Sequence, residues 1–230
     1  LIARSEDKLR ALAAELEKKY GIQVQVIVKD LSNYETAKDI YAYCKSNSIK
    51  IEYLINNAGF GDYGKFHEID LERQVQMINL NITTLTCLTR LFLPGMVQNK
   101  IGKILNVASI ASVLPGPLMA VYYATKAFVL HFSEAIGNEL SGTGVTVTCL
   151  CPGGTETNFF IEANAKESAF AKGKTFISPG KVATYGFESM MKGKPVAIHG
   201  VMNYLMVNSV RFFPRNIVTK VSRQMSETKK

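Results

Sequence analysis

Short apolar runs rich in β-branched residues alternate along the chain with longer amphipathic stretches. The runs have the length of strands that are buried on both faces, and the stretches between them carry apolar residues at helical spacing. The expected strands cover residues 24–28, 51–55, 103–107, 145–150 and 195–200. This alternation predicts a mostly parallel sheet with helices on both faces, a doubly wound α/β fold in a single domain, residues 1–230.

The expected helices lie between these strands, and several begin or end at a known signal. The first follows the possible cap Ser5 and carries Leu9, Leu12 and Leu16 at helical spacing. The next covers residues 33–46, and a long apolar series over 75–88 predicts a third helix that ends near Pro94. The last two cover residues 121–140 and begin at the cap pair Ser178 and Pro179, respectively.

Small and polar residues follow three of the expected strands. The loops read NNAGFG at 56–61, ASIAS at 108–112 and CPGGTET at 151–157. Ligands of doubly wound sheets bind beyond the carboxyl ends of the strands. These three loops are therefore expected to meet around a ligand.

A tyrosine and a lysine four residues apart share one helix face, and the sequence contains three such pairs: Tyr34/Lys38, Tyr41/Lys45 and Tyr122/Lys126. Position separates the third pair from the other two. Ser109 lies just past the end of a strand, 13 residues before Tyr122. A hydroxyl, a phenol and an ammonium group are therefore expected at one sheet edge, with Tyr123 as a packing residue.

Taken together, these motifs resemble the short-chain dehydrogenase/reductase family over essentially the whole chain. The matching segments are NNAG at 56–59, INLNI at 78–82, the serine of NVASIAS, the YxxxK of YYATK, and CPGGTET. The resemblance implies a Rossmann-like fold, an NAD(P)-dependent oxidoreductase acting on a carbonyl or alcohol, and a catalytic tetrad of Asn81, Ser109, Tyr122 and Lys126. Asn79 is the alternative to Asn81 as the asparagine of this tetrad.

The chemistry of a carbonyl reduction explains these residue types. Hydride transfer places negative charge on the carbonyl oxygen, which then needs a proton donor and a hydrogen-bond donor. By the resemblance, Tyr122 gives the proton, Ser109 holds the oxygen, and Asn81 keeps a water at a local helix irregularity. Lys126 is expected to lower the pKa of the phenol and to hold the nicotinamide ribose.

The same resemblance implies a set of cofactor-binding residues. Arg4, at the end of the family's second strand, would pair with the 2′-phosphate of NADP, so NADP is favoured over NAD. Asp30 would contact the adenine, and Lys126 and Tyr122 would face the nicotinamide side. The remaining positions are Asn57, Ala58 and Gly59 on the adenine-ribose side, and Pro152, Gly153 and Thr157 over the nicotinamide. For Arg4 the alternative is a surface residue, and for Asp30 and Thr157 a turn or cap residue.

The chain departs from the family pattern at its beginning. It starts within the second strand of that pattern, and no GxxxGxG or GxGxxG turn for the pyrophosphate occurs in it. Two explanations compete: a fragment of a longer protein, which we favour, or a truncated chain that folds without catalysis. The second makes a catalytically silent binding module the alternative to an enzyme.

Composition and cysteine spacing narrow the class of protein. The chain is 47% hydrophobic and 20% charged, and its longest apolar runs are far shorter than the ~20 residues of a membrane span. Its four cysteines form no CxxC, and no histidine lies at metal-ligand spacing, so neither a disulfide framework nor a metal site is expected. A cytoplasmic protein with free thiols fits this pattern.

The basic charge is concentrated in residues 201–230, a predicted helical extension with apolar positions between its arginines. Six basic residues and one acidic residue give this segment +5 of the net charge of +8. A solvated basic end, with helices that cover the substrate cleft or a subunit contact, is expected. Peripheral membrane contact is a less favoured alternative, and no nucleic-acid partner is expected because clustered base-stacking aromatics are missing. The basic residues are Arg211, Arg215, Lys220, Arg223, Lys229 and Lys230, against Glu227.

Substrate specificity is expected to lie in residues 109–120 and 151–194, where apolar side chains and prolines favour a hydrophobic carbonyl or alcohol substrate. The helix that carries Tyr122 also carries Phe128 and Phe132, which are candidates for contact with a second subunit. A homodimer or homotetramer is expected.

Overall fold

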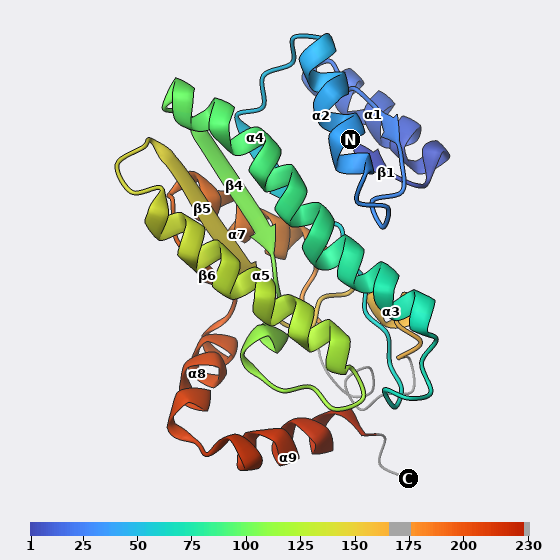
Figure 1. The fold of residues 1–230 in the computed structure, drawn as a ribbon, viewed down its shortest axis with the longest axis vertical. Coiled ribbons are helices and arrows are strands. Elements are labelled where there is room, and N and C mark those ends of the chain that lie inside the picture. Colours follow the sequence, from blue (N-terminus) through green and yellow to red (C-terminus); the bar gives the residue numbers. More distant parts are fainter. Residues whose placement is uncertain (166–175, 228–230) are drawn as a thin grey trace.

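The computed structural model describes residues 1–165 and 176–227, and within them helices cover both faces of a parallel sheet (Figure 1). The strands are β1 (Ile2–Ala3), β2 (Ile27–Val28), β3 (Tyr53–Asn56), β4 (Gly102–Val107), β5 (Val145–Cys151) and β6 (Val196–Ile198). The helices are α1 (Glu6–Tyr20), α2 (Thr36–Ser46), α3 (Leu71–Ile78), η1 (Asn79–Thr84), α4 (Leu85–Asn99), η2 (Ile110–Val113), α5 (Ala120–Glu139), α6 (Phe159–Glu162), α7 (Pro179–Met191), α8 (Val201–Ser209), η3 (Val210–Phe212) and α9 (Arg215–Ser226).

Alternate residues of the central strands face opposite helix layers. Ile104 of β4 packs with Phe92 and Met96 of α4, whereas Leu105, the next residue, packs with Met190 of α7. All six described strands pair in parallel. The predicted doubly wound α/β fold is therefore confirmed.

The described strands form two sheets rather than one. β3, β4, β5 and β6 are paired in that order, and β1 pairs only with β2. On β3, Tyr53 and Ile55 are 48% and 50% exposed, although the strand is apolar. Their partners in register are Lys103 and Leu105, so they belong to the sheet face that α7 covers farther along. The described residues leave this part of that face open.

The helix over 71–99 differs from the expected one in its end and in its middle. It was predicted to end near Pro94 but runs to Asn99, because the burial of Phe92 and Met96 on either side of the proline holds the last turns in place. Its middle, η1, is a π-helical turn. By length and composition alone the continuous helix could cross a membrane, a test that core helices of soluble proteins also pass.

Two predicted helix starts hold, and one predicted strand is shorter than expected. Ser178 caps α7 as expected, and its hydroxyl accepts a hydrogen bond from the Lys181 amide at 3.4 Å. Ser5 occupies the N-cap position of α1 without a side-chain bond. The strand expected over 24–28 is reduced to β2, since in the described chain it pairs only with the two residues of β1.

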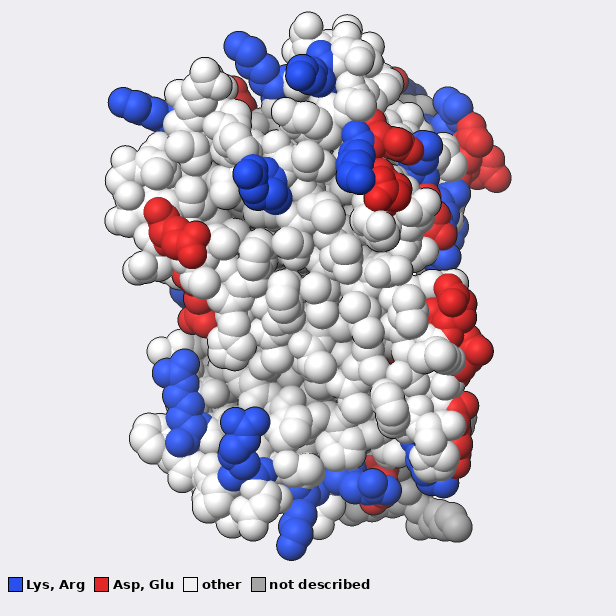
Figure 2. All heavy atoms as spheres, viewed as in Figure 1, with Lys and Arg blue, Asp and Glu red and all other residues white. Residues whose placement is uncertain are grey.

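Charged side chains are unevenly distributed over the face that α4 and α5 form. Figure 2, drawn from the same side as Figure 1, shows a broad band there in which charged groups are sparse, with lysines and arginines above and below it. Phe128 of α5 is 38% exposed and stacks on Phe132, with ring centroids 5.6 Å apart. Helix α5 therefore offers apolar surface to solvent.

Candidate active site

The carboxyl ends of β3, β4 and β5 lie side by side, as the motif positions predicted. Beneath the loops, Asn56 donates to Asn106 at 2.8 Å and to Thr89 of α4 at 3.2 Å. Asn106 in turn donates to Ser133 of α5 at 2.9 Å. These buried bonds tie two helices to two strands and fix the base on which the site is built.

Tyr122 and Lys126 lie on consecutive turns of α5 and are 9% and 6% exposed. The Lys126 ammonium donates to the carbonyl of Val107 at 2.8 Å and lies 5.9 Å from the centre of the Tyr122 ring. Burial disfavours its charged form and lowers the pKa of Lys126 to about 8. The lysine is thus placed to exchange a proton near neutral pH.

The pKa of Tyr122 departs from its ordinary value in the direction opposite to the one expected. Burial raises it, and the nearby Ser109 hydroxyl opposes that rise. The phenol ring lies against Phe159, with ring centroids 5.1 Å apart, and the ammonium of Lys126 is directed to a backbone carbonyl. Since desolvation dominates, this structure holds the phenol in its protonated form, which is the form of a proton donor.

Ser109 lies where β4 ends and is placed by the turn that follows it. It is the N-cap of η2, and its hydroxyl oxygen accepts a hydrogen bond from the Ala111 amide at 3.1 Å. The hydroxyl therefore has a fixed position beside Tyr122 and keeps its own hydrogen available for a further acceptor.

Asn81 lies inside the π-helical turn and is 1% exposed. Its amide nitrogen donates to Thr125 at 3.0 Å, the residue before Lys126, and to the carbonyl of Phe60 at 3.0 Å; its oxygen accepts from the Phe60 amide at 3.2 Å. A helix irregularity is present where one was expected, and it brings Asn81 rather than Asn79 against α5 and the loop after β3.

The loop after β3 is open to solvent and passes close to Lys126. Asn57, Ala58 and Gly59 are exposed. A Cβ at Gly59 would lie 3.0 Å from the Asn81 oxygen and 3.3 Å from the Lys126 nitrogen. The missing side chain thus leaves a small open cradle next to a buried ammonium, and Lys126 is the donor available to a ribose hydroxyl there.

The CPGGTET loop closes the other side of the site. The Pro152 carbonyl accepts from the Ile110 amide at 3.0 Å, which fixes the loop to η2. Gly153 packs under α8, where a Cβ would lie 2.5 Å from the amide nitrogen of Asn203. Thr157 is exposed, and its hydroxyl accepts from the Phe159 amide at 3.3 Å, a contact of the cap type.

Arg4 and Asp30 lie apart from this group, at the ends of β1 and β2. Both are exposed. The Asp30 carboxylate accepts from the amide and the hydroxyl of Ser32, each at 2.8 Å. The Ser32 amide bond lowers the pKa of Asp30, and the charge of Arg4 adds to the effect, so the two side chains are neighbours.

An apolar wall faces Tyr122. Met77, Met119 and Phe160 belong to the cluster that packs around its ring. At Gly61 a Cβ would lie 2.8 Å from the Phe159 ring and 3.1 Å from the Tyr122 ring. The loop over 109–120 and the start of the 151–194 segment contribute side chains to this wall, while residues 166–175 lie outside the described part of the chain.

The sequence did not indicate an ion pair that braces this wall. Asp62, with its side chain 5% exposed, accepts from Arg73 of α3 at 2.5 Å and from Asn164 at 3.2 Å. Arg73 also donates to the carbonyl of Glu162. This clasp, defined by Asp62, Arg73 and Asn164, joins α3 to the segment around α6 and borders a hollow of about 350 Å³.

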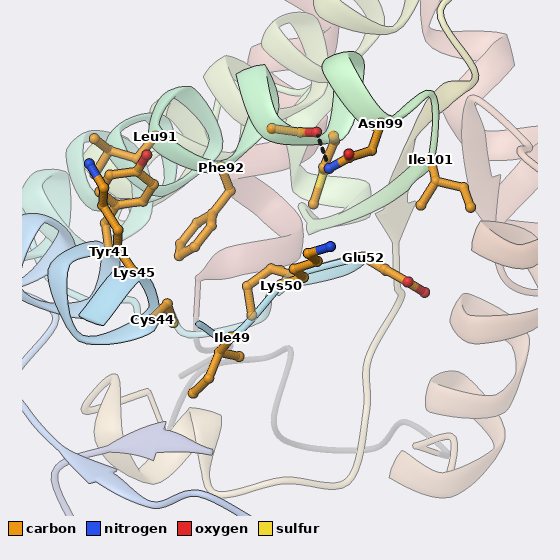
Figure 3. Close-up of a pocket in the computed structure, with 13 residues that line it drawn as sticks. Tyr41, Cys44, Lys45, Ile49, Lys50, Glu52, Leu91, Phe92, Asn99 and Ile101 are labelled. Atoms are coloured by element: carbon orange, nitrogen blue, oxygen red, sulfur yellow. Dashed lines mark hydrogen bonds between the residues drawn. The ribbon is translucent and has the colours of Figure 1, made fainter. Parts of the chain in front are cut away.

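A second hollow, of about 390 Å³, lies at the opposite ends of the strands (Figure 3). Tyr41 and Cys44 of α2 face Phe92 of α4 across it, and Ile49 and Ile101 line its rim. The residues before β3 and β4 border this hollow. It is therefore separate from the site at the carboxyl ends.

Comparison with known proteins agrees with this geometry. Residues 1–168 match the family described as short chain dehydrogenase. The chain is 33% identical over 250 residues to the very-long-chain 3-oxoacyl-CoA reductase of Rattus norvegicus, covering 100% of this chain and 75% of that protein. It is 32% identical to the Homo sapiens enzyme of the same name, covering 97% of this chain and 71% of that protein.

Solved structures show the same fold. A short-chain dehydrogenase from Sphingobium yanoikuyae in complex with NADPH superposes with a TM-score of 0.81 at 28% identity, over 92% of this chain and 82% of that chain. A 7beta-hydroxysteroid dehydrogenase superposes with a TM-score of 0.83 at 25% identity, over 96% of this chain and 84% of that chain.

Proposed function

Because the chain belongs to the short-chain dehydrogenase family, it is an oxidoreductase that transfers a hydride between a nicotinamide cofactor and a carbonyl or alcohol, and we propose that it reduces the 3-oxo group of a long-chain acyl thioester with NADPH. One observation carries the proposal: the buried Tyr122 phenol, with the Ser109 hydroxyl beside it, packs against an apolar wall. The relatives are reductases, and this favours an enzyme over a silent binding module.

When bound, the cofactor supplies the hydride, and the chain's own residues handle the oxygen and its proton. The Ser109 hydroxyl donates a hydrogen bond to the carbonyl oxygen, and the Tyr122 hydroxyl transfers its proton to that oxygen as negative charge develops on it. The raised pKa of Tyr122 keeps the proton in place until then. Lys126, with a pKa of about 8, returns a proton to the site afterwards.

Asn81 and Lys126 hold the groups around the reacting carbonyl in position. The Asn81 amide bridges the Phe60 carbonyl and the Thr125 hydroxyl, both at 3.0 Å, and so fixes the start of α5 against the loop after β3. In the proposed complex Asn57, Ala58 and Gly59 line the adenine-ribose side. Lys126 holds a hydroxyl of the nicotinamide ribose, and Pro152, Gly153 and Thr157 cover the nicotinamide.

The preference for NADPH is proposed from the charge at the end of β1. Arg4 is an exposed cation beside Asp30, and a 2′-phosphate is a dianionic group that a guanidinium binds in two places. Asp30 on the same edge is held as an anion by Ser32 and would face the adenine. The Sphingobium protein, at 28% identity, was solved with NADPH.

The substrate class is proposed from the wall opposite Tyr122. Phe159, Met119 and Phe160 present hydrocarbon and aromatic surface to the reacting group, which suits an acyl chain better than a sugar. The very-long-chain 3-oxoacyl-CoA reductases that the chain resembles act, by their name, on such chains.

Assembly and compartment are proposed on separate grounds. The sparsely charged face over α4 and α5 suits contact with a second copy (Figure 2). Phe128 of α5, exposed and stacked on Phe132, is a candidate for that contact. Cys44, Cys87, Cys149 and Cys151 are free thiols, as in a reducing cytoplasm. Sedimentation analysis of wild type and Phe128→Asp tests the first proposal, and a shift to monomer in the variant supports it.

The activity is tested by following NADPH oxidation with 3-oxoacyl thioesters of increasing chain length. We expect kcat/KM to rise with chain length and the rate with NADH to be lower. Equal rates across the series would contradict the proposed substrate class, and retained turnover in Tyr122→Phe would contradict the mechanism.

A further inference from the structure

The C-terminal helices present an apolar outer surface, here called the α8–α9 surface. Its members are eight large apolar side chains, each at least 46% exposed. They are Val201, Met202, Tyr204 and Leu205 of α8, Phe212 and Phe213 in and after η3, and Ile217 and Val221 of α9. Single exposed apolar residues are ordinary, but a contiguous group of this kind marks an interaction surface.

These residues are not on the side by which α9 packs against the protein. That side carries Val218, Ser222 and Ser226, all buried. The Ser226 carbonyl accepts a hydrogen bond from the Tyr63 hydroxyl at 3.0 Å. Since the helix is already anchored through this side, its exposed apolar side chains are available to something else.

Two of the exposed side chains, Phe212 and Phe213, lie in the turn between the two helices. Ile217 and Val221 are four residues apart and therefore share one side of α9, and Phe213 lies just before that helix. Phe212, 84% exposed, is the last residue of η3, and Pro214 is the N-cap of α9. Two adjacent aromatic rings at a turn form a tip that can enter an apolar medium before the helices do.

Cations border the same tip. Arg211, Arg215, Lys220 and Arg223 are all exposed. Glu227 is the single acid among residues 201–227, and Arg223 binds it at 2.6 Å. Figure 2 shows lysine and arginine side chains collected along the lower edge, where Figure 1 places α9.

We propose that the α8–α9 surface docks reversibly on the surface of an anionic phospholipid bilayer. Aromatic and aliphatic side chains among cations are what an interfacial helix needs, because the apolar groups enter the headgroup boundary while the cations bind lipid phosphates. A second copy docked face to face would oppose its own four cations to these, so like charge disfavours self-association here. The proposal concerns binding and stands independently of the proposed substrate.

The absence of tryptophan from the sequence allows a direct optical test. Phe212→Trp places one fluorophore at the tip of the surface, and Phe66→Trp places one at a site that is 64% exposed in another part of the chain. With vesicles of phosphatidylcholine and phosphatidylserine we expect a blue shift for Phe212→Trp and none for Phe66→Trp. Equal shifts, or no shift at the tip, would overturn the proposal.

Co-sedimentation with the same vesicles tests the role of charge. Each cation near an anionic surface contributes about fivefold in affinity, so Arg211→Gln, Arg215→Gln and Lys220→Gln combined should weaken binding by about a hundredfold. Lys8→Gln, Lys18→Gln and Lys192→Gln combined, a matched loss of charge on α1 and at the end of α7, should have a much smaller effect.

Three results count against lipid docking. They are unchanged binding in the cation variant, equal binding to vesicles of phosphatidylcholine alone, and a Phe212→Trp blue shift that follows protein concentration without vesicles. The last would identify the surface as a contact between copies. Matching circular dichroism spectra and melting temperatures establish that each variant is folded.

Discussion

The two sides of the proposed cofactor site are built in different ways. On the side of β4 and α5, Lys126 and Asn81 are buried, and hydrogen bonds to Val107, Thr125 and Phe60 hold them. On the side of β1 and β2, Arg4 and Asp30 are exposed, and a bond from Ser32 is the main support.

This difference separates two requirements. Proton transfer needs groups held in one geometry with shifted pKa values, and burial supplies both. Choosing between cofactors that differ by one phosphate needs only a charge in reach, which a surface side chain provides. Variants on the buried side should therefore change rate and stability, whereas variants on the exposed side should change cofactor preference alone.

The largest effect is expected at the phenol of the buried side. Tyr122→Phe removes the proton donor and keeps the ring, and we expect kcat to fall by about 10²–10⁴-fold, the usual contribution of general acid–base catalysis. Steady-state NADPH oxidation measures it. Tyr123→Phe is the matched control, since Tyr123 is also buried but packs against Gly116 and α9. Loss of activity in both variants would show that packing rather than proton donation had been disturbed.

The next effect concerns the stability of the buried side and its dependence on pH. In the unfolded chain Lys126 has a pKa of 10.5, and folding lowers it to about 8. Between these values the unfolded state binds more protons, so this lysine makes the free energy of unfolding rise with pH across that window. Below it the whole penalty, about 3 kcal/mol, is present.

Lys126→Met tests that penalty. At neutral pH the variant should unfold with a free energy higher by about 2 kcal/mol, because the lost bond to the Val107 carbonyl offsets part of the gain. The advantage should shrink as pH rises towards 10.5. Urea denaturation at a series of pH values measures it, and a difference that stays constant with pH would contradict the shifted pKa.

A smaller effect is expected at the ion pair between Asp62 and Arg73, which braces the apolar wall on the substrate side. Arg73→Met leaves the buried Asp62 carboxylate without its cation, and we expect a loss of about 2 kcal/mol in stability and a higher KM for the thioester. Asp62→Asn combined with Arg73→Met should cost less than Arg73→Met alone. If the double variant is instead the less stable one, the pair does not act as a clasp.

The smallest effect belongs to the exposed side. Arg4→Glu should raise the KM for NADPH by about fivefold and lower that for NADH, with unchanged melting temperature, because one surface charge is worth about 1 kcal/mol. Lys8→Glu, a charge change nearby on α1, should leave both values unchanged. A drop in kcat would show that the exposed side also affects the rate, and that it is therefore coupled to the buried side.

The sequence predicted the parts of the site that depend on local spacing. Tyr122 and Lys126 are four residues apart on one helix, and the strand ends that carry Asn56 and Ser109 meet because parallel strands end at one edge. Such relations follow from helix and strand periods alone. The fold class followed in the same way.

The parts that were missed depend on contacts between distant segments. Asp62 and Asn164 are 102 residues apart, and no pattern in either segment signals their bond. The direction of the pKa shift of Tyr122 was wrong because it depends on how deeply Phe159 and Tyr123 bury the ring. Pro94 was mistaken for a helix end because the packing of its neighbours outweighs its local preference.

The division of the sheet has a practical consequence for handling the protein. Within the described residues, β1 and β3 each leave one strand edge unpaired, and the apolar Tyr53 and Ile55 are exposed beside the second edge. Open edges of this kind recruit strands from other molecules. Concentrated solutions of a chain in this conformation should therefore aggregate through β3, and a lysine in place of Ile55 should improve solubility.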